Sequence, residues 1–354
     1  MLRNPPALFS HNGVLKVNFS YQTTVDAAGR NLFCFMTPDG LQNPTLHVLP
    51  GDHLIIHVTN NTPAGSPVMQ IAPPNCGATS LTASSVNLHF HGTNTSPSCH
   101  QDQVIRTLIN SGQSFTYDVL FPTNEPPGLY WYHPHAHMLV EAALQGGPSG
   151  AIVVDGIQSI QPVVAGLNQQ LIVIRDQNVA SNPIPGGDVP SWDLSLNYIP
   201  IAYPDEIPAV IQMRAGQKEL WRVSNSSADS ILDLQVQFDG KPQTLQIVGL
   251  DGVPTGSQDG WRGKLLNATH LLIPTAGRAE FLLSAPPKTV TDARLITLRI
   301  NTGPDGDNDP QRTLATIQTV SGPGSKPSII NADSRIPGQV GRPWKQRFER
   351  LAWT

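Results

Sequence analysis

The sequence predicts an all-β protein built from two successive β-sandwich domains. Its 354 residues include 33 prolines and 30 glycines, and charged residues make up 14% of the chain. Average domains carry about 25% charged residues. A composition that is rich in turn formers and poor in charge favours short strands joined by many turns over long helices. The length fits two or three domains of ordinary size.

The second half of the sequence repeats the first half in outline. Gly51 precedes an apolar strand that leads to Asn60. Gly216 precedes a second apolar strand that leads to Asn225 at the same offset. Self-similarity at a fixed spacing indicates repeated structural units. We therefore expect two copies of one β-sandwich.

The predicted first domain spans residues 1–157 and closes with an apolar strand at 150–155. The second domain is expected at residues 158–322. Residues 323–354 contain Gly, Pro, Ser and Arg without a long periodic element. They are expected to form a linker that leads toward a third domain missing from this chain.

The strands of the first domain are predicted from alternation and from the turns that bound them. Residues 53–58 alternate clearly, and further strands are expected at 86–92, 114–121 and 128–137, with one or two helical turns at 138–145. In the second domain, strands are expected at 220–223, 243–248, 270–273, 278–283, 295–301 and 314–320.

Two His-x-His pairs, His89 with His91 and His133 with His135, carry the main sign of chemistry. Residues i and i+2 of a strand point to the same face, so each pair presents two imidazoles side by side. Two such pairs on neighbouring strands would place four imidazoles around one small volume. Neutral imidazole suits Cu, Zn, Fe and Ni, and unpaired buried polar groups are costly. The four histidines therefore predict a metal site.

Leu88-His89-Phe90-His91-Gly92 and the segment 128–135, Gly-Leu-Tyr-Trp-Tyr-His-Pro-His, closely resemble the first two copper motifs of multicopper oxidases, the laccase-like enzymes. The double His-x-His with these flanks is specific, whereas either pair alone would be weak. The resemblance extends over 112–117, 146–154, 220–225 and 250–252, and covers roughly residues 14–320.

The resemblance implies a cupredoxin-like, Greek-key β-sandwich in each half. It also implies that His89 is a type 2 copper ligand and that His91, His133 and His135 are type 3 copper ligands. In the family, these ligands hold half of a trinuclear cluster that reduces O2 to water with four electrons taken from a reducing substrate. Asp102 falls in the loop after the first motif, where family members often carry an acidic residue that assists proton delivery. A loop-capping Asx turn is the alternative role for Asp102.

The sequence also departs from the family. A type 1 copper requires two His and a Cys thiolate, and no Cys of this chain lies between two His. Pro134 occupies the middle of the later His pair, and the other four trinuclear ligands are missing. We therefore expect incomplete type 2 and type 3 copper sites, a truncated laccase-like oxidase, and completion of the cluster by a third domain or a partner chain.

Two other functions compete with this interpretation. The chain could be a non-catalytic copper-binding protein that uses the four histidines. It could also be a cupin-type metalloenzyme, since His135, His137 and Glu141 offer two imidazoles and a carboxylate.

The remaining features bound the partners and the location. A net charge of −4 predicts no nucleic-acid partner, and no apolar window approaches the length of a membrane span. Residues 1–6 show no signal peptide, yet laccase-like enzymes commonly work outside the cytoplasm. We therefore expect an incomplete N-terminus and an extracellular or periplasmic location. Cys76 and Cys99 flank the first His pair and either form a disulfide or, with Cys34, remain thiols.

Overall fold

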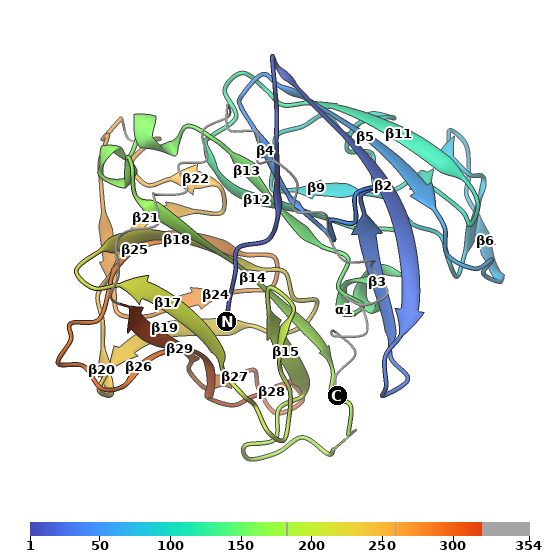
Figure 1. The fold of residues 1–354 in the computed structure, drawn as a ribbon. Coiled ribbons are helices and arrows are strands. Elements are labelled where there is room, and N and C mark those ends of the chain that lie inside the picture. The colour runs from blue at the N-terminus through green and yellow to red at the C-terminus, as the bar shows by residue number, and fades with distance from the viewer. Residues whose placement is uncertain (182, 259, 321–354) are drawn as a thin grey trace. The chain divides into compact units, whose positions relative to one another are not determined.

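The structure is a computed structural model that describes residues 1–320 except 182 and 259 (Figure 1). The predicted linker at 323–354 lies outside the described residues. Within the described part, helix is confined to α1 (Val140–Gln145) and two short 3-10 helices, Ile157–Ser159 and Pro162–Val164. The predicted all-β class is therefore confirmed. None of the helices in this part of the chain is long and apolar enough to cross a membrane.

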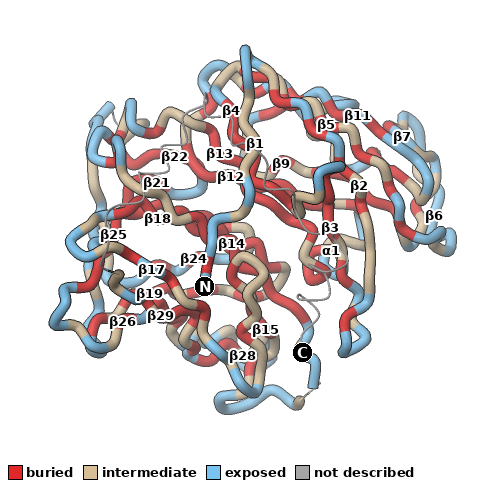
Figure 2. Tube along the Cα trace, viewed as in Figure 1, coloured by how far each residue is buried: buried red, intermediate tan, exposed pale blue. Residues whose placement is uncertain are grey.

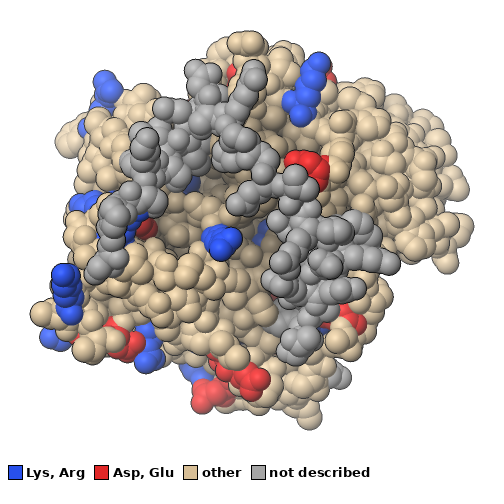
Figure 3. Space-filling view, in the orientation of Figure 1, with Lys and Arg blue, Asp and Glu red and all other residues tan. Residues whose placement is uncertain are grey.

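The chain folds into two compact units, which divide between Asp155 and Gly156. The first unit contains residues 6–155, and the second contains residues 1–5 with the described residues from 156 onward. On the face shown in Figure 3, charged side chains are sparse and of mixed sign, which fits the low charge content of the sequence.

The first unit is a sandwich of two main sheets. One sheet has the order β11 (Ser114–Leu120), β5 (His53–Asn60), β2 (Val14–Val25), β3 (Asn31–Met36). The other has the order β1 (Ala7–Phe9), β4 (Thr45–Val48), β13 (Gly150–Val154), β12 (Gly128–His133), β9 (His89–His91). Two small pairs complete the unit: β6 (Pro67–Gln70) with β8 (Ser80–Thr82), and β7 (Cys76–Gly77) with β10 (Thr107–Leu108).

Alternation along the strands builds the core of this unit (Figure 2). On β5, Leu54, Ile56 and Val58 are fully buried, and the residues between them face outward. His53 and His57 are among the outward residues, as the alternation predicts. Burial of the apolar face stabilises the sandwich. It also fixes which side chains of each strand point away from the core.

The second unit has the same plan. One sheet has the order β16 (Ile199–Ile201), β15 (Trp192–Leu196), β14 (Asn168–Asn178), β18 (Lys218–Asn225), β25 (Arg278–Ser284), β21 (Leu245–Leu250), β22 (Val253–Pro254), with β23 (Leu266–Ala268) beside β21. The other has the order β17 (Ala209–Arg214), β29 (Arg312–Val320), β26 (Ala293–Thr297), β19 (Leu232–Phe238), β20 (Lys241–Pro242), with β24 (Leu271–Ile273) beside β19. A separate pair joins β27 (Ile300–Asn301) to β28 (Asn308–Asp309).

Strand directions confirm the correspondence between the units. β5 pairs parallel to β2 and antiparallel to β11, and β18 pairs in the same way with β14 and β25. In the other sheet, β4, β13, β12 and β9 of the first unit correspond to β17, β29, β26 and β19 of the second. Gly51 and Gly216 both adopt positive φ, at 90° and 73°, where a residue with a side chain would be strained.

Asn60 ends β5 as a fully buried amide. Its Nδ2 donates to the carbonyl oxygens of Ser84 and Ile109 at 2.8 Å, and its Oδ1 accepts from the backbone N–H of Thr62 at 3.0 Å. The amide therefore ties the strand end to two other segments.

Asn225 ends β18 in the same manner. Its Nδ2 donates to the carbonyl oxygens of Ser230 and Ile273 at 2.9 and 3.1 Å, and its Oδ1 accepts from the backbone N–H of Ser227 at 3.3 Å. The residues that carried the sequence repeat thus perform one structural role twice.

We expect Asn60→Ala and Asn225→Ala each to lower the free energy of unfolding by roughly 2–4 kcal/mol, because each leaves several buried carbonyl groups unpaired. Native-state hydrogen exchange of the β5 and β18 amides would assign each loss to one unit. Loss of protection in both units from a single substitution, or in neither, would contradict the independent roles described above.

Candidate metal centre

The two His strands are direct neighbours in one sheet. β9 and β12 pair antiparallel, with His89 opposite His133 and Phe90 opposite Tyr132. Phe90 and Tyr132 are fully buried in the core of the first unit. Because side chains alternate across a sheet, His89, His91 and His133 all point to the face away from that core.

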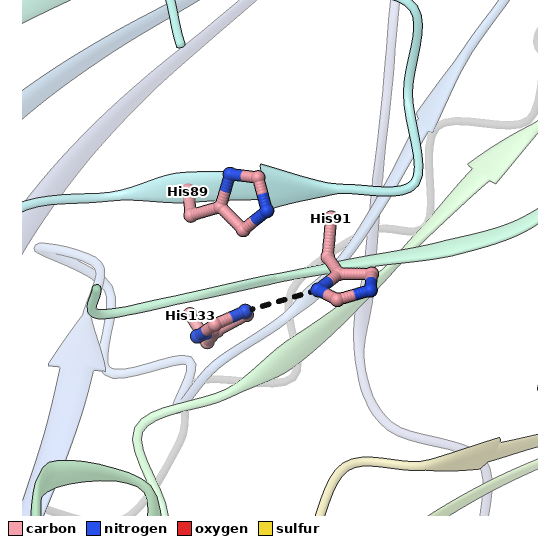
Figure 4. A group of neighbouring side chains, drawn as sticks. All are labelled: His89, His91 and His133. Atoms are coloured by element: carbon pink, nitrogen blue, oxygen red, sulfur yellow. Dashed lines mark hydrogen bonds between the residues drawn. The ribbon is translucent and has the colours of Figure 1, made fainter. Parts of the chain in front are cut away.

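Donor atoms of these three histidines converge (Figure 4). One ring nitrogen from each of His89, His91 and His133 lies within 4.8 Å of the nitrogens of the other two. The closest pair is Nε2 of His133 and Nδ1 of His91, which are 3.4 Å apart. Among the described residues, these three side chains form the group of His, Cys, Asp or Glu with spacing suited to a metal ion.

His135 lies at the margin of this cluster. Its ring centroid is 5.2 Å from that of His89 and 5.6 Å from that of His133, and its nitrogens are not among the converging donors. The expectation that a strand continues through His135 was wrong. β12 ends at His133, because Pro134 has no N–H to offer a ladder, so alternation does not set the direction of the His135 ring.

Hydrogen bonds at Nδ1 define the tautomers of two rings. Nδ1 of His89 lies 2.9 Å from Oδ1 of Asp102, and Nδ1 of His133 lies 2.8 Å from the carbonyl oxygen of Pro134. A carbonyl or carboxylate oxygen accepts, so each Nδ1 carries the proton. Nε2 of both rings is left with a lone pair, which is the form that binds a metal.

Burial keeps two of the imidazoles neutral. Desolvation lowers the pKa of His133 well below its ordinary value, and the neighbouring His89 ring lowers it further, against an opposing hydrogen bond to Pro134. Desolvation also lowers the pKa of His135, with His89 again adding to the effect. Both rings are therefore neutral at neutral pH, each with one nitrogen lone pair that can bind a metal.

Asp102 lies in the loop that follows β9 and accepts hydrogen bonds from that strand. Its Oδ1 receives the Nδ1–H of His89 and also the backbone N–H of Phe90 at 3.0 Å. The backbone N–H of Asp102 itself donates to Ser96 at 2.9 Å. Asp102 thus contacts a candidate ligand directly, as well as organising its own loop.

A disulfide anchors that loop. Cys76 and Cys99 are bonded, with Cα atoms 5.7 Å apart, while Cys34 is a buried free thiol. The backbone N–H of Cys76 also donates to the carbonyl oxygen of Arg106 at 3.0 Å. The segment from Cys99 to Arg106, with Asp102 inside it, is therefore fastened at both ends to one residue.

Sequence reasoning missed two buried residues that tie the surrounding loops together. Asn87 accepts the backbone N–H of His135 at 2.6 Å and donates to the carbonyl oxygen of Val104 at 2.9 Å. The carboxylate of Glu125 accepts the backbone N–H of Asn94 at 3.0 Å. Asn87 lies in the predicted strand 86–92, on the alternating face of His89 and His91, but alternation does not reveal its partners; Glu125 belongs to no periodic pattern. An acidic residue directly before Pro126-Pro127-Gly128 was the available signal for Glu125.

The other candidate ligands do not join the cluster. Among the described residues, His137 is exposed and Glu141 is an exposed residue of α1, and neither belongs to the converging group. The cupin-type arrangement of His135, His137 and Glu141 is therefore not formed. His53 lies elsewhere, on the outer face of β5, with its Nδ1 2.8 Å from Asp118.

Comparison with known proteins gives one family model and two related sequences. The family model described as "Multicopper oxidase" matches residues 80–159, which include both His pairs. The chain is 34% identical over 106 residues to the iron transport multicopper oxidase FET3 of Gibberella zeae, a match that covers 29% of this chain and 14% of that protein. It is 25% identical over 177 residues to the L-ascorbate oxidase of Brassica rapa subsp. pekinensis, covering 49% and 25% respectively.

Solved structures show the same fold. The multicopper oxidase McoA of Aquifex aeolicus aligns with a TM-score of 0.64 at 14% identity, over 90% of this chain and 64% of that one. A multicopper oxidase of Campylobacter jejuni aligns with a TM-score of 0.60 at 20% identity, over 95% and 65%. The described part of the chain is a tandem of cupredoxin-like β-sandwiches, the fold of these multicopper oxidases. The chain spans less than two thirds of the length of these relatives.

We expect Asp102→Ala to let His89 populate both neutral tautomers, because the substitution removes the carboxylate that accepts the Nδ1–H hydrogen bond. Nitrogen NMR of the metal-free chain should then show His89 as a mixture of tautomers. Asp118→Ala is a matched control, since it removes an equivalent partner from His53 on the outer face. A His89 ring that stays protonated only at Nδ1 in Asp102→Ala would show that the hydrogen bond is not the determinant.

Proposed function

We propose that this chain supplies half of the ligands of a trinuclear copper centre in a laccase-like oxidase. Such an oxidase takes electrons singly from a reducing substrate and reduces O2 to water with four of them. The observation that carries the proposal is the 3.4 Å separation of Nε2 of His133 and Nδ1 of His91. Both rings lie on the face of β9 and β12 that points away from the core, within the residues that match the family model.

The donor set fits copper. Metal–imidazole bonds are about 2.0–2.1 Å long, so two imidazoles on one tetrahedral ion hold their nitrogens about 3.3 Å apart. The 3.4 Å separation of His91 and His133 suits one shared ion. Neutral imidazole is a ligand that copper accepts, and the lowered pKa of His133 keeps that ligand neutral.

The remaining residues take separate roles. His89 serves the type 2 position, with its Nε2 free for the metal and its Nδ1–H held by Asp102. His135 serves a further type 3 position at the margin of the cluster. Bound copper would supply the electron-transfer chemistry. The Asp102 carboxylate accepts the Nδ1–H of His89 and therefore lies beside the proposed copper site. From there, this carboxylate can pass protons toward reduced oxygen.

Completion of the centre requires further ligands. Four histidines are half of the set that the family uses, and a type 1 site needs a Cys between His residues, which this sequence does not contain. We therefore propose that a third cupredoxin-like domain, in the same polypeptide or in a partner chain, supplies the rest. The Cys76–Cys99 disulfide favours an extracellular or periplasmic location, where such bonds persist.

A second candidate function is copper binding without catalysis. The three converging imidazoles all come from one unit, so this unit could hold copper without any other domain. The two functions differ in what happens after a complementary domain is added. An oxidase gains O2 consumption with a reducing donor, and a storage protein does not.

Copper titration of the purified chain tests the proposed ligands. We expect copper binding without an intense blue thiolate band, and we expect His133→Gln to weaken the affinity by at least about 10-fold, since a ligand is lost. His53→Gln is the matched control, because His53 is an exposed histidine of the same unit. Equal weakening in both variants, or in neither, would count against the assignment.

A further inference from the structure

Trp131 contacts both imidazoles of the closest pair. Its ring centroid lies 4.1 Å from that of His133, with the two planes inclined by 20°, and 5.1 Å from that of His91, inclined by 32°. The side chain is 1% exposed. These separations lie in the range of direct aromatic contact.

The strand register places the indole there. Trp131 lies directly opposite His91 on β9 and two residues before His133 on β12, so all three side chains share one face. On the other neighbouring strand, β13, the residue opposite Trp131 is Ala151. Its small side chain occupies little of the sheet face that it shares with the indole.

Volume alone does not account for a tryptophan at this position. Among the described residues, Nε1 of Trp131 is buried and has no hydrogen-bond partner. Burying an unpaired N–H is unfavourable, and Leu or Phe would fill space without that penalty. What the indole adds is a broad flat face against two imidazole rings.

The two imidazoles need that face. Two imidazoles can bind one ion only if their ring planes are held so that both nitrogen lone pairs point at that ion. Contacts from neighbouring residues commonly orient metal ligands in this way. The hydrogen bond to Pro134 fixes one edge of His133, and it leaves the ring plane to be set by packing. The stacked indole supplies the packing, and it reaches His91 from the same position.

We propose that Trp131 is a positioning residue whose indole holds the ring planes of His91 and His133 so that their donor nitrogens converge. The inference rests on the proposed copper function for the identity of the ion. The ring placement itself exists before any metal is bound.

Two substitutions, Trp131→Leu and Trp131→Phe, test this role in the full chain, with Trp221→Leu as the control. Trp221 is also fully buried, on β18 of the second unit. In the metal-free wild type, the stacked indole shifts the His133 ring protons upfield in the NMR spectrum. That shift, and the cross-peaks between the His91 and His133 rings, should be lost in Trp131→Leu and reduced in Trp131→Phe. The control should keep both signals. Unchanged signals in the Trp131 variants would overturn the proposal.

Copper affinity provides the second readout. Titration with Cu(II) against a competing chelator should show that Trp131→Leu weakens binding by about 10–100-fold, the range for partners that orient a ligand. Trp221→Leu should leave the affinity unchanged. A folded Trp131→Leu chain that binds Cu(II) as tightly as the wild type would also overturn the proposal.

The two readouts separate this inference from the proposed function. A wild-type chain that binds no Cu(II) would defeat the copper assignment, while the ring-proton signals would still decide whether Trp131 positions the imidazoles. If Trp131→Leu does not fold, Trp131→Phe decides by the same two measurements.

Discussion

The candidate metal centre depends on one constraint, the register in which β9 pairs with β12. A shift of β9 by one residue would turn His89 and His91 into the core, away from His133 on β12, and would expel Phe90 from the core. Phe90 and Tyr132 are opposite each other and fully buried, so the hydrophobic effect that builds the sandwich also fixes the register. The ligands therefore gain their placement from the packing on the opposite face of the same two strands.

The second unit shows what the sandwich looks like without this chemistry. β19 and β26 occupy the places of β9 and β12 and pair in the same direction, yet neither strand contains a histidine. The buried Asn60 and Asn225 show that the architecture was otherwise retained in both units. Fold and candidate site are thus separable, and the proposed function rests on a few residues of one strand pair.

Much of this could be predicted from the sequence, because strands impose a period of two. That period identified the outward face of β5 and the shared face of His89, His91 and His133. It did not locate His135, since Pro134 ends the strand. It also missed β14, whose buried central run Leu-Ile-Val-Ile does not alternate. The contacts of Asn87, Glu125 and Trp131, and the Cys76–Cys99 bond, join segments far apart in the chain or across strands. Single-sequence periodicity contains no information about such pairings.

The most direct test of the central claim is anomalous diffraction at the copper edge from crystals of the chain grown with copper. Our account predicts an anomalous peak within bonding distance of both Nε2 of His133 and Nδ1 of His91. The result that would contradict it is copper found only at exposed histidines, with the His91 and His133 nitrogens still 3.4 Å apart and no peak between them.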